Sequence, residues 1–186
     1  MKKIFTLLFV TTFLFTSCSD DGEPGPQGPQ GPPGEDGLDR LAYTLEEQIT
    51  FDYYDDTNSY SRVIIIPDDV QTINPEADAV LVYRYREIQD NDGNFIDTWS
   101  LIPQNFFLND GTIQYVYNHT PSDVEIIIEG NFDLSNLSTD YTNNQIFRVV
   151  VVPSDYLASH NELDIANYNA VMKELNLKTS DIKMAN

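Results

Sequence analysis

The sequence predicts a mainly β protein: an antiparallel β-sandwich of about eight strands with one C-terminal helix. Apolar runs after residue 41 are short and rich in Val, Ile, Tyr and Phe, which are residue types favoured in strands. Turn-forming Asp, Asn and Gly separate these runs at regular intervals. No helical crossover segment lies between the runs, so parallel pairing is not expected. A small β-barrel is the alternative architecture.

The first strands are expected between residues 48 and 102. Residues 48–53 alternate between polar and apolar side chains, as a half-buried strand does. Residues 62–67 form a β-branched run that ends at a proline, which is typical of a strand buried on both faces. Residues 79–88 and 95–102 read as two paired strands, because the Asp-, Asn- and Gly-rich segment 90–94 between them forms a hairpin loop.

The same pattern continues through the second half of the region. Residues 105–108 and 112–117 flank Asn109-Asp110-Gly111, a strong hairpin signal. Residues 124–128 predict a further strand, and residues 132–144 are polar and irregular. The valine-rich run 146–153 again ends at a proline, and it predicts a strand buried on both faces.

One helix is expected near the C-terminus. Ser159 and Glu162 have the spacing of a capping box, which predicts that the helix begins at Ser159. Apolar residues then follow at helical intervals, namely Ile165, Tyr168, Met172 and Leu175. Lys173 suits the negative end of the helix dipole. Residues 179–186 are expected to fray.

The N-terminus has the parts of a secretory signal. Met1-Lys2-Lys3 is basic, residues 4–15 are apolar but too few to span a bilayer, and small residues precede Cys18. The segment resembles a bacterial lipoprotein signal, although Phe15 stands where that signal usually has Leu. The resemblance implies cleavage before Cys18 and attachment of lipid, such as palmitate, to its sulfur. The expected division is therefore signal peptide 1–17, anchor and stalk 18–40, sandwich 41–158, and helix with tail 159–186.

Residues 19–23 form an acidic cluster directly after the anchor. This cluster resembles the surface-export signal of lipoproteins in the Bacteroidota. The resemblance implies an outer-membrane protein that is lipid-anchored and faces the cell exterior. A solvated acidic spacer, with a periplasmic orientation, is the alternative.

Glycine occupies every third position from residue 22 to residue 37. The glycines in this register are Gly22, Gly25, Gly28, Gly31, Gly34 and Gly37. The run resembles collagen, in which only glycine fits at the axis of the triple helix. Eighteen residues of polyproline II would span about 55 Å, so a single chain would form a semi-rigid stalk. The alternative is a homotrimer through residues 22–39.

Composition excludes several classes of function. The formal net charge of −20 disfavours nucleic acid as a partner, because binding there relies on Lys and Arg. It also disfavours attachment to anionic lipid through a basic surface, so membrane attachment is expected through Cys18 alone. A single cysteine allows no intrachain disulfide and no zinc site built on thiolates. We expect no cofactor and no metal site.

Four oxygen-bearing side chains in and after the 90–94 loop could bind calcium: Asp90, Asp92, Asn94 and Asp97. Their spacing fails the EF-hand pattern, because Gly93 is the fourth residue of the segment and not the sixth. A plain hairpin loop is the alternative. A second acidic cluster comprises Asp52, Asp55 and Asp56, and the same alternative applies to it.

His119 and His160 are the only histidines, and neither has a partner at metal-ligand spacing. A serine nucleophile with either histidine as base is open, because triads assemble from distant parts of a chain. No recognisable catalytic motif supports that reading, and no catalytic residue is predicted.

Aromatic side chains could form a sugar-stacking platform, with core or interface packing as the alternative. These residues are Trp99, Tyr53, Tyr54, Tyr83 and Tyr85. Tyr83 and Tyr85 are two residues apart in a predicted strand, so they are expected to share one face.

Over residues 1–37 the chain resembles collagen-repeat-bearing surface lipoproteins of the Bacteroidota. The expected function is a non-catalytic binding or structural β-sandwich held at the cell surface on the collagen-like stalk. The first alternative is a glycan-binding module of a surface uptake system, and the second is a tethered hydrolase.

Overall fold

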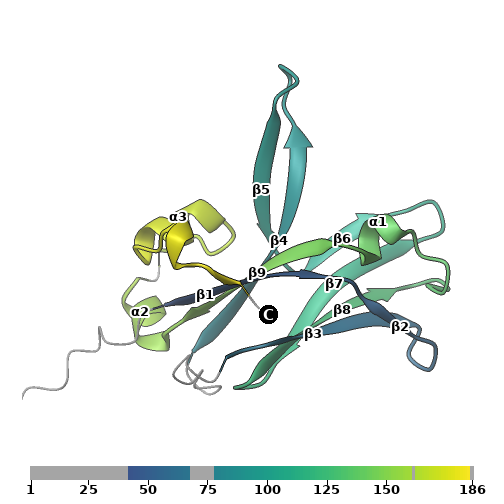
Figure 1. Ribbon diagram of the computed structural model, residues 1–186, viewed down its shortest axis with the longest axis horizontal. Helices are drawn as coiled ribbons and strands as arrows, with labels where there is room; N and C mark the ends of the chain where they lie inside the picture. The colour runs from purple at the N-terminus through teal and green to yellow at the C-terminus, as the bar shows by residue number, and fades with distance from the viewer. Residues whose placement is uncertain (1–41, 68–77, 161, 185–186) are drawn as a thin grey trace, which may run out of the picture. The chain divides into compact units, whose positions relative to one another are not determined.

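The computed structural model describes residues 42–67, 78–160 and 162–184. All of these residues belong to one compact unit, Asp36–Asn186, that contains two five-stranded sheets (Figure 1). The sheets pack on each other without closing into a barrel, as expected for an antiparallel β-sandwich. The signal segment, Cys18 and the collagen-like residues 22–39 lie outside the described residues.

Sheet A has the strand order β10-β1-β9-β4-β5. It contains β1 (Tyr43–Ile49), β4 (Ala79–Gln89), β5 (Phe95–Leu101), β9 (Gln145–Val152) and β10 (Lys183–Met184). All neighbours in this sheet are antiparallel except β10, which runs parallel to β1. The predicted hairpin at residues 79–102 is thus confirmed, and in Figure 1 its outer half projects away from both sheets.

Sheet B has the strand order β2-β3-β8-β7-β6, with every neighbouring pair antiparallel. It contains β2 (Asp52–Tyr54), β3 (Ser59–Ile65), β6 (Gln104–Phe107), β7 (Thr112–His119) and β8 (Asp123–Gly130). The hairpin predicted around Asn109-Asp110-Gly111 joins β6 to β7. A short helix, α1 (Thr139–Thr142), lies in the segment that was predicted to be irregular.

The main core lies between the two sheets. Alternate residues of β8, namely Val124, Ile126 and Ile128, are fully buried there and face residues of β9 such as Val149. Aromatic rings fill one end of this core, where Phe51 meets Phe147 edge to face at 6.0 Å. The period of two in each strand therefore sorts apolar side chains inward, as predicted.

A second core covers the other face of sheet A. Tyr83 and Val150 point away from sheet B and pack against Tyr168 and Val171 from the C-terminal segment. That segment contains α2 (Ser154–Ser159), α3 (Tyr168–Glu174) and the 3₁₀ helix η1 (Thr179–Asp181). On the left of Figure 1, α2 and α3 lie beside sheet A. Strand β9 is therefore buried on both faces, as its sequence predicted.

The predicted strand at residues 48–53 is wrong, because these residues belong to two strands in different sheets. β1 ends at Ile49 and β2 begins at Asp52. Between them, the amide of Phe51 donates a 2.9 Å hydrogen bond to the carbonyl of Thr142, and the Phe51 side chain is buried. The alternating pattern continues because the chain keeps one side toward the core while it crosses from one sheet to the other.

The prediction that residues 62–67 are buried on both faces is also wrong. Val63 and Ile65 are 43% and 63% exposed, whereas Ile64 and Ile66 lie in the core. β-branched residues favour a strand, but whether its second face is covered depends on another layer of the fold. The C-terminal segment forms such a layer over sheet A, and β3 belongs to sheet B.

The predicted start of the C-terminal helix is wrong as well. Ser159 ends α2, and α3 begins at Tyr168 after Asn167, whose side chain accepts a 3.1 Å hydrogen bond from the amide of Ala170. Lys173 does lie in the last turn of α3, as predicted.

Residues 179–184 do not fray, because they form η1 and then β10, which pairs with Leu45 and Glu46 of β1. The described residues thus form ten strands, two of which, β2 and β10, have only three and two residues. Within the described ranges, no helix is long and apolar enough to cross a membrane.

Candidate functional site

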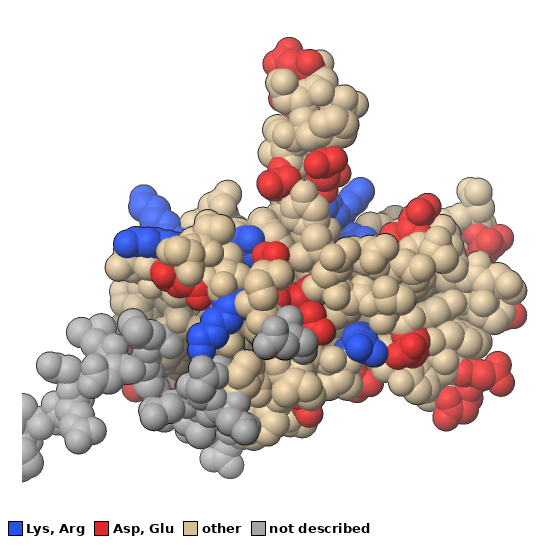
Figure 2. All heavy atoms as spheres, in the orientation of Figure 1, with Lys and Arg blue, Asp and Glu red and all other residues tan. Residues whose placement is uncertain are grey.

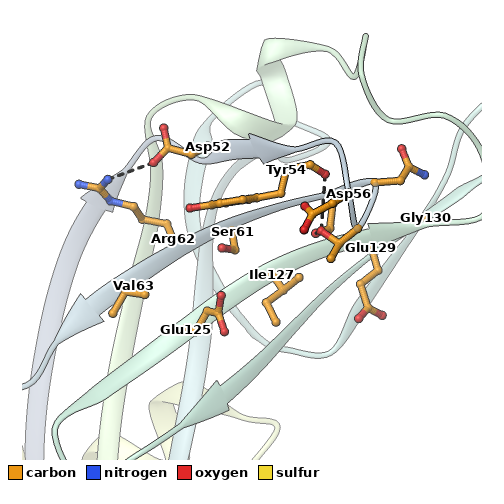
Figure 3. Close-up of a pocket in the computed structure, with 13 residues that line it drawn as sticks. Asp52, Tyr54, Asp56, Ser61, Arg62, Val63, Glu125, Ile127, Glu129 and Gly130 are labelled. Carbon is orange, nitrogen blue, oxygen red and sulfur yellow. Dashed lines mark hydrogen bonds and ion pairs between the residues drawn. The ribbon is translucent and has the colours of Figure 1, made fainter.

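The outer face of sheet B carries a groove of about 780 Å³ (Figure 3). Its lining comes from β2, β3 and β8 and from the turn between β2 and β3. This face lies on the opposite side of sheet B from the main core. The groove is therefore a surface that the packing of the sandwich leaves open.

Side-chain size explains why a groove forms on this face. On β3, Ser61 faces outward and has Asp52 of β2 as its partner on one side and Ile127 of β8 on the other. One step along the strand, Ser59 lies beside Tyr54 of β2. Small side chains on the middle strand thus lie between larger ones on its neighbours. Because adjacent strands are about 4.8 Å apart, the groove is about 10 Å wide between its two walls.

The wall formed by the β2–β3 turn is held in place by Asn58. The backbone of Asn58 adopts a φ of 48°, in the left-handed region that asparagine tolerates. Its side-chain amide donates a 2.8 Å hydrogen bond to the carbonyl of Phe132, and its side-chain oxygen accepts one of 2.8 Å from the amide of Leu134. Below the wall, the Tyr53 ring packs on Tyr60 at 5.0 Å. These contacts fix the position of the neighbouring Tyr54.

The groove is acidic. Asp52 pairs with Arg62 at 3.4 Å, and both side chains remain largely exposed. The carboxylates of Asp56, Glu125 and Glu129 also line the groove, and none of them makes a hydrogen bond or ion pair with a described residue. In Figure 2, Asp and Glu side chains are spread over the right-hand part of the view, which carries β2 and β3. Unpaired acceptors therefore predominate around the groove.

Ser61 lies at the floor of this groove. It is only 9% exposed, yet its hydroxyl makes no hydrogen bond with any described residue. Solvent reaches its hydroxyl oxygen from the groove, so water or a ligand can hydrogen-bond to it there. Figure 3 places Ser61 between Tyr54, Arg62 and Glu125. The hydroxyl is thus a free donor and acceptor at the centre of the groove.

Most of the aromatic residues considered for a sugar-stacking platform pack into the protein, which is the alternative given for them. Tyr83 is fully buried, and Tyr85 contacts Trp99 at 5.2 Å. Tyr83 and Tyr85 lie on the same face of sheet A, as their spacing predicted. Trp99 is covered further by Arg148, whose guanidinium lies 3.8 Å from the ring centroid. Of these five residues, Tyr54 alone keeps a largely open ring, at 47% exposure, and it lies in the groove.

Of the side chains that could have bound calcium, Asp90, Asn94 and Asp97 are engaged in local hydrogen bonds. The Asp90 carboxylate accepts from the Asn94 side chain and from the amides of Asp92 and Asn94, which holds the pKa of Asp90 below its usual value. Asp97 accepts a 2.7 Å hydrogen bond from the hydroxyl of Tyr85. In the described part of the chain, no group of three or more His, Cys, Asp or Glu side chains could hold a metal ion. The loop is a hairpin stabilised by its own polar groups.

The structure places a serine beside one of the two histidines. Ser159 Oγ lies 3.0 Å from His160 Nδ1, and His160 Nε2 lies 3.7 Å from Glu174. However, His160 Nδ1 also lies 2.9 Å from the carbonyl of Tyr156, which can only accept. That contact keeps the proton on Nδ1, so this nitrogen has no lone pair with which to activate Ser159. The arrangement ends α2, while His119 lies exposed at the end of β7.

Sequence reasoning did not identify Ser61, Glu125 or Glu129 as site residues. A signal was present, because Glu125 and Glu129 alternate with buried residues of β8 and must point outward. What the sequence did not show is that β2 and β8 flank β3. Cys18, the predicted lipidation site, lies outside the described residues. No protein family, curated protein or solved structure shows a match to this chain.

Proposed function

We propose that this chain is a lipid-anchored lipoprotein of the outer membrane that faces the cell exterior and presents its β-sandwich as a non-catalytic binding module. The anchor is the lipid on Cys18, and the collagen-like residues 22–39 hold the sandwich away from the membrane. The apolar segment before Cys18, the small residues next to it and the acidic residues after it support this part of the proposal.

A single structural observation supports the binding function: the two outer faces of the sandwich differ. The outer face of sheet A is covered by the C-terminal segment, which buries Tyr83, Val150 and Val152 there. The outer face of sheet B is open and hollowed, and its groove holds free carboxylates and the unpaired hydroxyl of Ser61. A module with one covered face and one grooved polar face is suited to binding a ligand on the second face.

The membrane part of the proposal can be tested in bacterial cells that produce the full chain. Cells are fed labelled palmitate, their membranes are separated, and intact cells are treated with protease. We expect the chain to carry the label, to fractionate with the outer membrane and to be digested on intact cells. The Cys18→Ala variant should lose the label and leave the membrane fraction, whereas the neighbouring Ser19→Ala variant should behave as the parent chain does.

Two results would contradict this proposal. Palmitate label that persists in the Cys18→Ala variant would show that the lipid is attached to a residue other than Cys18. Complete protection of the chain from protease on intact cells, with digestion after lysis, would show that the sandwich does not face the cell exterior.

A further inference from the structure

We infer that the groove on sheet B, which we define as the Tyr54–Ser61 groove, binds a neutral glycan. This inference deepens the proposed function, on which it rests, by naming the class of ligand that the binding face takes. Three properties of the groove favour such a ligand: its mixture of donors and acceptors, the sign of its charge, and its shape.

The groove offers the mixture of polar groups that a sugar needs. Each sugar hydroxyl both donates and accepts a hydrogen bond, so a sugar site needs acceptors and donors close together. The free carboxylates of Glu125 and Glu129 are acceptors, and the guanidinium of Arg62 is a donor at the end beside Asp52. Ser61, whose hydroxyl faces the groove from the floor and has no partner among the described residues, can do either. A ligand hydroxyl would satisfy the Ser61 hydroxyl without displacing any existing contact.

Charge decides between classes of glycan. The groove has the carboxylates of Asp52, Asp56, Glu125 and Glu129 against the single guanidinium of Arg62. An anionic polysaccharide would bring like charges together in the groove, which is unfavourable. A neutral glycan avoids that repulsion and still uses each carboxylate as an acceptor. A cationic peptide would gain from the carboxylates, but it has no use for Arg62 or for the hydroxyls on the floor.

The shape of the groove also fits a sugar chain. The serines of β3 leave a channel one strand wide between β2 and β8, and the Tyr54 ring, 47% exposed, stands on one wall. Aromatic rings offer a flat apolar surface against which the C–H face of a pyranose can stack. The hydrogen bonds of Asn58 to the 132–134 segment hold the β2–β3 turn, so little ordering is needed on binding.

The test uses the full chain, extracted from membranes in detergent, and immobilised polymers of three kinds. Amylopectin, galactomannan, xyloglucan and laminarin are the neutral probes, polygalacturonate is the anionic probe, and poly-L-lysine is the cationic probe. We expect binding to at least one neutral polysaccharide, little change on adding salt, and none to polygalacturonate. Screening by salt weakens attraction between charges and leaves neutral hydrogen bonding and stacking in place.

Variants assign the binding to the groove. Tyr54→Ala removes the ring and Ser61→Leu fills the floor, and each should weaken the dissociation constant about tenfold or more, as loss of a central contact does. Glu125→Gln is a further variant, because it exchanges one carboxylate of the groove wall for a neutral amide of similar size at a half-buried position, and it should also weaken binding. Phe107→Ala is the matched control: Phe107 is 84% exposed on β6, outside the groove on the same sheet, and this change should leave binding within about twofold.

The outcomes separate the glycan inference from the proposed function. Binding to a neutral polysaccharide that Tyr54→Ala weakens and Phe107→Ala does not would support the inference. Salt-sensitive binding to poly-L-lysine alone would overturn it in favour of a cationic partner, although the proposed binding face would stand. Neutral binding that no groove variant weakens would overturn the assignment to this groove, as would the absence of binding to every neutral probe.

Discussion

The hydroxyl of Tyr83 in β4 donates a 2.6 Å hydrogen bond to the carbonyl of Ile165, which lies before α3. This bond joins the centre of sheet A to the C-terminal segment across 82 residues of sequence. The Tyr83 ring also meets Tyr168 edge to face at 5.1 Å. The C-terminal segment is therefore a structural layer of the sandwich, and among the described residues it covers the outer face of sheet A while the outer face of sheet B stays open.

We expect Tyr83→Phe to lower the free energy of unfolding by about 1 kcal/mol, because the Ile165 carbonyl loses its donor while the aromatic packing remains. Chemical denaturation of the two proteins measures the difference. Tyr54→Phe, at an exposed ring, is the control and should change the value by less than about 0.5 kcal/mol. An equal loss in both variants would contradict a specific role for the Tyr83 hydroxyl.

Arg84 forms a second unusual arrangement inside the fold. It is 6% exposed, it donates hydrogen bonds of 3.1 and 2.5 Å to Gln145 Oε1, and its Nη1 has no hydrogen-bond partner among the described residues. Its guanidinium lies 4.7 Å from the centroid of the Tyr115 ring, and burial lowers the pKa of Arg84. A cation is therefore held in the core by a neutral amide and aromatic rings.

We predict that Gln145→Leu destabilises the protein more than Arg84→Met does. Gln145→Leu removes the acceptor of a buried cation, which costs about 2 to 3 kcal/mol. Arg84→Met removes the charge together with its desolvation cost and should stay within about 1 kcal/mol of the parent. Unfolding in denaturant, with the double variant included, measures both. A larger loss for Arg84→Met would show that the cation itself stabilises the core.

The carboxyl group of Glu47 gives a pH-dependent prediction. Burial raises the pKa of Glu47 above its ordinary value of 4.5, and the opposing effect of Arg62 is smaller. The folded protein therefore favours the protonated form, so the contribution of Glu47 to stability is present below pH 4.5 and is lost as pH rises through its folded pKa. We expect Glu47→Gln to raise the free energy of unfolding at neutral pH and to have little effect at acidic pH. If Glu47→Gln stabilised the protein equally at both pH values, burial of the charged Glu47 carboxylate would not be the cause.

Tyrosine titration gives a prediction at alkaline pH. A hydrogen bond to Asp97 raises the pKa of Tyr85 to about 12, and burial raises that of Tyr115 to about 12. Since the fold favours the neutral phenols, their contribution to stability is lost as pH rises from 10 towards 12. Asp97→Asn should move the pKa of Tyr85 down towards 10 and leave the pKa of Tyr115 unchanged. Tyrosinate absorbance, measured also in the Tyr85→Phe and Tyr115→Phe variants, assigns each ionisation to its residue. If neither ionisation shifts in Asp97→Asn, the hydrogen bond to Asp97 is not what raises the pKa of Tyr85.

The collagen-like segment is tested by mass in solution. We expect residues 19–186 and the same chain without residues 19–40 both to be monomers by light scattering. Six triplets are few for a triple helix, and three copies of Glu23, Glu35 and Asp36 would meet without a Lys in the run to pair with them. If the longer chain is a trimer and the deletion turns it into a monomer, the collagen-like segment is a trimerisation element and not a single-chain stalk.

The sequence predicted the strands well where local patterning decides the structure. Both hairpins were identified, because Asn109-Asp110-Gly111 and the 90–94 loop carry turn chemistry that acts over a few residues. The strand 146–153 was read as buried on both faces, because its valines leave no polar side for water.

Predictions failed where a distant part of the chain decides the outcome. Val63 and Val150 look alike in sequence, but only Val150 is covered, because the C-terminal segment packs on sheet A. The groove could not be predicted for the same reason. Alternation alone shows that Ser61 and Glu125 point outward, whereas the pairing of β3 with β8, which sets Ser61 beside Ile127 and Val63 beside Glu125, is a matter of strand order.

Ligand binding on the outer face of sheet B is tested most directly by NMR. A neutral oligosaccharide is added to the chain from residue 18 onward, with Cys18→Ala, and the residues that it contacts are mapped. Trp99 is the only tryptophan, and it lies on sheet A, so its indole signal is an internal reporter of the opposite face. We expect the amide shifts to concentrate at Tyr54, Ser61 and their neighbours on β8 while the indole signal stays fixed. Shifts at Trp99 with an unchanged sheet B would contradict this expectation.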